Sequence, residues 1–177
     1  AVEHASVKAT LSYLKTLGFT VVTVPPAADG EYHTEDFLRE IDSSVCLVSM
    51  MLVNNETGAL QPVAQAAQLL RRKQSAALLH TDAVQGFLKV PFSAKALGAD
   101  FIAISGHKVG APKGIGALYV RRKPRVRIEP QIHGGGHERG MRSGTLATHQ
   151  IVGMGEAYRL ALLEADKDRE HAEKLSK

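Results

Sequence analysis

Chemically reactive side chains follow three apolar segments of this 177-residue chain. The pentapeptide NNETG (54–58) comes after VCLVSMML (45–52), TDAVQ (81–85) comes after AALLH (76–80), and SGHK (105–108) comes after DFIAI (100–104). Short continuous apolar runs of this kind are typical of strands buried on both faces of a parallel sheet. Ligands of open α/β sheets bind at the carboxyl ends of the strands, so we expect these three turns to meet at one edge.

The three turns contain groups that together suit one cofactor. Lys108 supplies an amine that can form a Schiff base with a carbonyl carbon. Asp82 supplies a carboxylate that can keep a pyridine nitrogen protonated. Ser105, His107 and the backbone N–H groups around them can bind a phosphate. An aldehyde, a ring nitrogen and a phosphate describe pyridoxal 5′-phosphate (PLP), so the pattern predicts a PLP site rather than a hydrolytic triad.

Each of these residues also has an ordinary structural interpretation. A lysine after a strand is commonly a solvated side chain, and an aspartate there commonly caps the next helix. Asn54 and Asn55 could simply form a turn. The cofactor hypothesis therefore depends on the agreement of three turns, and no single residue carries it.

The elements that must position these residues alternate between helices and strands. Apolar spacing predicts helices that end at Gly18 or begin at Pro62, and a helix with Thr34 as its N-cap. The expected helices are 5–17, 34–41, 62–74 and about 147–174, and the expected strands are 19–25, 45–52, 76–82, 100–105 and 116–122. Strands that alternate with helices indicate an α/β fold with a mainly parallel sheet.

Composition narrows the classes of protein further. A chain with 44% hydrophobic and 23% charged residues suits one globular domain with a core. No apolar run reaches the roughly 20 residues of a membrane-spanning helix, so no membrane partner is expected. A net charge of +4 with only 5% aromatic residues predicts no nucleic-acid partner. The chain starts and stops within helical patterns, which suggests part of a longer protein.

Four segments resemble a known family: MLVNNETG, HTDAVQ, SGHKVGAPKGIGALYVRR and HGGGHERGMRSGT. They are similar to the cysteine desulfurases, class V aminotransferase-like PLP enzymes of fold type I. The likeness runs through nearly the whole chain and is strongest over 104–158, where it resembles the iron–sulfur-assembly branch. The resemblance implies that residues 1–177 belong to the three-layer α/β large domain that binds PLP. Residues 147–177 would then lead towards a small C-terminal domain that is absent here.

The resemblance also implies roles for residues around the cofactor ring. Lys108 would carry the Schiff base and then act as an acid–base group, and Asp82 would pair with the ring nitrogen. Gln85 and Asn55 would reach the phenolic oxygen of the ring.

Further roles concern the phosphate and the ring face. Ser105 and His107 would bind the phosphate, together with Thr145 from the neighbouring subunit of a homodimer. His4, in the segment EHAS, would stack on the ring and assist proton transfer. The other interpretation of His4 is an exposed residue at the start of a helix.

The implied activity is that of a sulfurtransferase acting on L-cysteine. Such an enzyme yields alanine and an enzyme persulfide, whose sulfur serves iron–sulfur cluster and thio-cofactor assembly. The family's nucleophilic cysteine lies on a loop beyond the matched region. Cys46, the only cysteine of the chain, lies in an apolar strand, where we expect a buried and inert thiol. The chain alone is therefore expected to be inactive.

Other functions stay open at this point. A selenocysteine lyase or another class V relative would share the same cofactor residues. A non-catalytic fragment could instead bind partners through the basic run 121–127 (RRKPRVR). In desulfurases the corresponding region faces acidic scaffold or sulfur-acceptor proteins. The resemblance implies a bacterial cytoplasmic protein, or one of the mitochondrial matrix if the source is eukaryotic.

Two glycine-rich motifs point away from other ligands. His133 and His137 have a metal-binding spacing only on a helix, and the three glycines between them disfavour a helix, so no metal is expected. GAPKGIG (110–116) lacks the Lys-Ser or Lys-Thr of a nucleotide-binding P-loop.

Overall fold

The computed structural model describes residues 2–28, 30 and 32–175. They divide into two compact units, a first unit within residues 1–104 and a second unit within residues 105–177.

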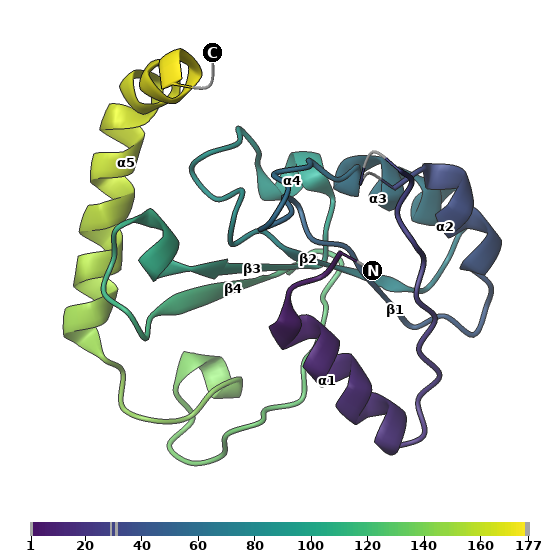
Figure 1. Ribbon diagram of the computed structural model, residues 1–177. Helices are drawn as coiled ribbons and strands as arrows, with labels where there is room; N and C mark the ends of the chain where they lie inside the picture. The colour runs from purple at the N-terminus through teal and green to yellow at the C-terminus, as the bar shows by residue number, and fades with distance from the viewer. Residues whose placement is uncertain (1, 29, 31, 176–177) are drawn as a thin grey trace. The chain divides into compact units, whose positions relative to one another are not determined.

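The first unit is built on a parallel sheet. Strands β1 (Leu47–Ser49), β2 (Leu78–Asp82) and β3 (Phe101–Ser105) lie side by side, with β2 between the other two (Figure 1). The register pairs Ser49 with His80 and Asp82 with Ala103. A continuous parallel sheet of apolar strands confirms the predicted α/β class.

Helices lie on both sides of this sheet. Figure 1 shows α2 (Thr34–Glu40), α3 (Val63–Arg72) and α4 (Ala94–Leu97) on one side and α1 (Ala5–Thr16) on the other. The arrangement agrees with the expected three layers. Helix α3 buries one apolar stripe at i, i+3, i+4 and i+7, formed by Val63, Ala66, Ala67 and Leu70.

The core of the first unit gathers around the strands and α3. Met50, Met51, Leu79 and Val63 are its largest fully buried apolar side chains. Complete burial of one such side chain contributes roughly 1.5–3 kcal/mol to folding. The carboxyl ends of the strands are therefore held on a rigid base.

The second unit contains the end of β3, a 3₁₀ turn η1 (Gly106–Val109), strand β4 (Gly116–Val120), a second 3₁₀ turn η2 (Glu138–Gly140) and the long helix α5 (Thr148–Leu175). The Gln150 side chain of α5 donates to the Lys113 carbonyl at 2.9 Å. A Cβ at Gly153 would lie 2.9 Å from Pro112, so α5 packs closely on the loop after η1. Among the described helices, none combines the length and apolarity needed to span a membrane.

Most predicted helices and strands are confirmed, and their ends lie within one or two residues of the predicted positions. The predicted strand 19–25 is wrong, because the structure assigns no strand there and leaves Phe19 and Val22 more than half exposed. The predicted strand 45–52 is regular only over β1, although the Met50 and Leu52 amides continue the ladder to β2. Helix α2 begins at Thr34, and its N-cap is His33 instead of Thr34.

Candidate functional site

Asp82 closes strand β2 at the carboxyl edge of the first unit. Its carbonyl accepts from the Leu52 amide at 2.8 Å, and its Oδ1 accepts from the Val84 amide at 2.9 Å. The residue is only 8% exposed. The bond to Val84 closes a local turn and not a helix N-terminus, because the next helix, α4, begins at Ala94 and is capped by Ser93. The capping interpretation of Asp82 is therefore wrong. Oδ1 still has capacity for a second donor.

The NNETG turn leaves β1 beside this aspartate. The Asn54 Oδ1 atom accepts from the Glu56 and Thr57 amides at 2.9 and 2.8 Å, and Asn54 is buried. Asn54 thus forms the turn, as its structural interpretation predicted. Asn55 is half-buried, and its Nδ2 donates to the Glu56 carboxylate at 2.6 Å. Gln85 is likewise half-buried, in the turn after β2.

The segment that carries His4 is fixed to the same edge. Val2 is bound on both sides: its carbonyl accepts from Asn54 Nδ2 and its amide donates to the Tyr32 hydroxyl, both at 3.0 Å. The exposed His4 caps α1, since its Nδ1 accepts from the Ser6 amide at 3.2 Å. Sequence reasoning therefore identified the helix-start position of His4 correctly, and the ring-stacking role stays a prediction.

Glu3 is a residue of this edge that sequence reasoning missed. It is 5% exposed, and its Oε1 accepts from the Met51 amide at 2.6 Å. Burial raises the pKa of Glu3 to about 7, the Met51 hydrogen bond opposes the rise, and the charge of Asp82 adds to it. The sequence offers no signal for this, because an acid before a helix is usually solvated or a cap.

The charge state of His80 is also set by its surroundings. Its Nδ1 lies 2.9 Å from the Ser49 hydroxyl on the neighbouring strand. Burial lowers the pKa of His80, although the charge of Asp82 acts in the opposite direction. His80 is therefore neutral at pH 7, and Asp82 has no imidazolium beside it on this strand.

The second unit brings Ser105, His107 and Lys108 together at the end of β3. The Ser105 hydroxyl lies 2.8 Å from His107 Nδ1, and both His107 and Lys108 are exposed. Within the part of the chain that the structure describes, Lys108 has no hydrogen-bond or ion-pair partner. A Cβ at Gly106 would meet a side-chain carbon of Ile115 at 2.8 Å, so the tight turn that presents these groups requires glycine.

The residues present have the chemistry that PLP needs. Lys108 is an exposed amine, the Ser105–His107 pair offers a hydroxyl and an imidazole to a phosphate, and Asp82 is a buried carboxylate. Thr145, the remaining predicted ligand, is exposed in the segment before α5. The chemical types of these side chains fit the cofactor.

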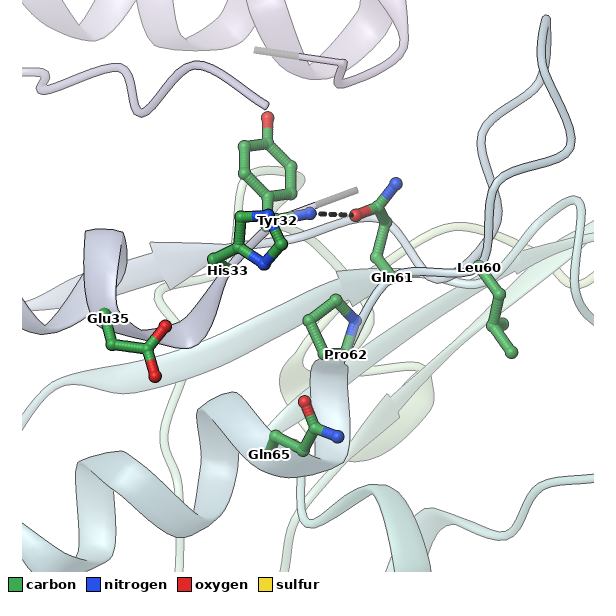
Figure 2. A pocket seen from close by; sticks show the side chains of 7 residues that line it. All are labelled: Tyr32, His33, Glu35, Leu60, Gln61, Pro62 and Gln65. Carbon is green, nitrogen blue, oxygen red and sulfur yellow. Dashed lines mark hydrogen bonds between the residues drawn. The ribbon is translucent and has the colours of Figure 1, made fainter. Parts of the chain in front are cut away.

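A pocket in the first unit contains none of these predicted residues. Figure 2 shows it between α2 and the start of α3, where Gln61 accepts from the Tyr32 amide at 3.1 Å. Gln61 also donates to the Gly30 carbonyl at 2.9 Å, so its polar groups already have partners. Among the described residues that line this pocket, none has a buried polar side-chain atom without a hydrogen-bond partner, so the strand ends remain the candidate site.

Two further expectations can be compared with the structure. Among the described residues, no cluster of three His, Cys, Asp or Glu side chains could hold a metal ion. His133 and His137 precede the 3₁₀ turn η2 and do not share a helix. The expectation of a buried Cys46 is wrong: the thiol is exposed, because β1 begins only at Leu47.

Comparison with known proteins places this chain in a family. The model of the family described as aminotransferase class-V matches residues 1–177. The chain is 50% identical over 169 residues to the cysteine desulfurase IscS of Aeromonas salmonicida strain A449, covering 96% of this chain and 41% of that protein. It therefore spans about two-fifths of the length of this curated relative.

Solved structures agree with the family assignment. One described as a NifS-like protein superposes with a TM-score of 0.94 at 41% identity, covering 99% of this chain and 47% of that one. Another, described as SspA in complex with cysteine, gives a TM-score of 0.84 at 38% identity, covering 89% of this chain and 45% of that one. The fold is thus that of the PLP-dependent transferases of this group, and the chain belongs to the aminotransferase class-V family.

Proposed function

We propose that this chain binds PLP and forms the cofactor-holding part of a cysteine desulfurase. The observation that carries the proposal is the 50% identity to cysteine desulfurase IscS across 96% of the chain. The exposed Lys108 amine beside the Ser105–His107 pair supports it. Class V aminotransferases generally depend on PLP, which the donor set fits.

In this proposal Lys108 holds the aldehyde carbon of the cofactor through its amine. Bound PLP supplies an electron sink for bond changes at the α-carbon of an amino acid. Asp82 keeps the ring nitrogen protonated, which strengthens that sink. The Nζ atom of Lys108 would also accept a proton from the substrate and return it.

The other predicted residues orient the cofactor. Asn55 and Gln85 would hold the phenolic oxygen of the ring, and His4 would contact the ring face. Ser105 and His107 bind the phosphate, and Thr145 does so from the neighbouring subunit of a homodimer. Because Asn54 and Val2 are hydrogen-bonded to each other, Asn55 and His4 keep a fixed relation at the edge of the first unit.

L-cysteine is the proposed substrate, with alanine as product and sulfur destined for iron–sulfur and thio-cofactor assembly. A structural relative was solved in complex with cysteine, which supports this choice. The exposed Cys46 precedes β1, and no residue contacts identify it as a nucleophile. We assign the nucleophile to a cysteine outside these 177 residues, in a protein of the bacterial cytoplasm or the mitochondrial matrix.

The chain corresponds in this proposal to the greater part of a PLP-binding large domain, with α5 leading towards a small domain. The basic run 121–127 provides a docking surface for an acidic scaffold or sulfur-acceptor protein. Its Arg122, Lys123, Arg125 and Arg127 are all exposed. The same exposure favours one alternative function, a non-catalytic fragment that binds partners only through this run.

Titration of the purified chain with PLP separates the two functions. We expect a visible absorption band from lysine-bound PLP in the wild type and in Lys113→Ala, and no band in Lys108→Ala. Lys113 is a suitable control because it is exposed and lies five residues away in the same glycine-rich segment. Equal spectra for wild type and Lys108→Ala would refute the proposal and leave the binding-only function.

A further inference from the structure

Glu3 is a buried carboxyl group that the proposed mechanism does not use. It is 5% exposed, and one oxygen, Oε1, accepts from the Met51 amide at 2.6 Å. The other oxygen, Oε2, is buried and has no hydrogen-bond partner among the residues that the structure describes. A buried group with one satisfied oxygen and one unsatisfied oxygen calls for a physical explanation.

Neutralisation of the carboxyl explains this arrangement. An ionised carboxylate without a partner is expensive to bury, whereas a protonated acid carries no net charge. Asp82 is a second buried acid at the same edge and interacts electrostatically with Glu3. Two neighbouring carboxylates resist simultaneous ionisation. The proton is expected on Glu3, because its Oε2 is buried without a donor among the described residues.

Glu3 also lies in the segment that positions His4. The residue before it, Val2, is bound to Asn54 and to the Tyr32 hydroxyl, and Glu3 itself is bound to Met51. Two of these bonds join residues 2 and 3 to the segment that follows β1, and the third joins Val2 to Tyr32. A change in the charge of Glu3 would therefore act on the part of the edge that carries His4.

We infer that Glu3 is a positioning residue of the proposed cofactor site. Glu3 holds the segment that carries His4 against the residues that follow β1, and its protonation state determines how much negative charge lies beside Asp82. The inference rests on the proposed function, since it assigns Asp82 to the ring nitrogen. Glu3 touches neither substrate nor cofactor in this scheme and acts through its neighbours.

Electrostatic interactions link the Glu3 carboxyl group to Asp82 at the end of β2, to the Tyr32 phenol in the segment before α2, and to the amino terminus. The positive charge of the amino terminus lowers the pKa of Glu3. Burial raises the pKa of Glu3 to about 7, so its charge changes near neutral pH. As the pH rises through neutrality, Glu3 therefore gains one negative charge beside Asp82, whereas an exposed glutamate would already be ionised throughout this range.

The first experiment uses the protein without PLP. Carbon-13 NMR of the Glu3 carboxyl is expected to show a midpoint near neutral pH, and Asp82→Asn is expected to lower that midpoint. A Glu3 that titrates like an exposed glutamate, or a midpoint unaffected by Asp82→Asn, would overturn the inference whether or not the chain binds PLP.

The second experiment measures PLP affinity for wild type, Glu3→Gln and the exposed control Glu40→Gln. At about pH 5.5 all three should bind equally, because Glu3 and its amide analogue are both neutral. At about pH 8.5 the wild-type carboxylate attracts the protonated ring nitrogen, so Glu3→Gln should bind roughly fivefold more weakly than wild type. Glu40→Gln should match wild type at both pH values.

The outcomes separate the two proposals. A parallel pH dependence in wild type and Glu3→Gln would refute the role of Glu3 and leave PLP binding intact. Failure of every variant to bind PLP would refute the proposed function, and the inference that depends on it would fall as well. The NMR titration would then show whether the coupling of the two acids exists without a cofactor.

Discussion

Replacing Glu3 by glutamine should remove a pH dependence from the stability of the chain. The pKa of Glu3 rises from 4.5 to about 7 on folding, chiefly through burial. Below pH 4.5 the group is protonated in both the folded and the unfolded chain, and its contribution to stability is complete. As the pH rises further, the unfolded chain releases the proton first, so the free energy of unfolding falls until the pH passes about 7.

The magnitude follows from the difference between the two pKa values. A separation of about 2.5 pH units (about 7 minus 4.5), at about 1.4 kcal/mol per unit, gives a total loss of about 3.5 kcal/mol. Glu3→Gln has no proton to release and should lack this loss. The glutamine amide also changes the free energy of unfolding through its own packing, but by an amount that does not depend on pH. The test is therefore the pH dependence of the difference in unfolding free energy.

Urea unfolding at about pH 5 and about pH 8 measures this change. The difference in unfolding free energy between wild type and Glu3→Gln should shift by about 2.5 kcal/mol between the two conditions, in favour of the variant at the higher pH. The shift is smaller than the total loss because the unfolded chain has already released much of its proton at about pH 5. Glu40→Gln, at an exposed position on α2, should follow wild type throughout. Parallel behaviour of wild type and Glu3→Gln would show that Glu3 is ionised in the folded chain and would refute the reasoning.

The remaining predictions concern single positions. Gly106→Ala places a Cβ 2.8 Å from a side-chain carbon of Ile115 and should destabilise the chain by about 1–3 kcal/mol. Gly155→Ala, on α5, adds a Cβ that has no neighbour within 4 Å and should be neutral or stabilising. Denaturant midpoints measure both effects. Asn54→Ala removes the acceptor of two backbone amides and should cost roughly 2–3 kcal/mol in the same assay, more than Asn55→Ala. Cys46→Ser changes an exposed thiol and should alter the free energy of unfolding by less than about 0.5 kcal/mol, with unchanged PLP absorption.

The sequence predicted those elements whose patterns are local. Helix α3 has a buried stripe at helical spacing after Pro62, and strands β2 and β3 are short apolar runs that end in polar residues. Residues 19–25 have the same β-forming composition but no strand in the structure. A strand needs a hydrogen-bonding neighbour as well as a suitable sequence, and the pattern of side chains does not reveal that neighbour.

The candidate site was predictable where residue types alone identify the chemistry. The amine of Lys108, the acid of Asp82 and the Ser105–His107 pair could be chosen from their positions after apolar strands. Glu3 could not, because its burial arises from contacts with Met51, 48 residues away along the chain. The exposure of Cys46 was missed for a related reason, since strand β1 is shorter than its apolar run.

The central claim is that Lys108 captures the aldehyde of PLP. Borohydride reduction of the PLP-treated chain, followed by peptide mass mapping, tests it most directly because reduction makes the amine–cofactor bond permanent. We expect the phosphopyridoxyl mass on the peptide that contains Lys108, with Lys113 unmodified. Modification spread over surface lysines, or absent at Lys108, would contradict the claim.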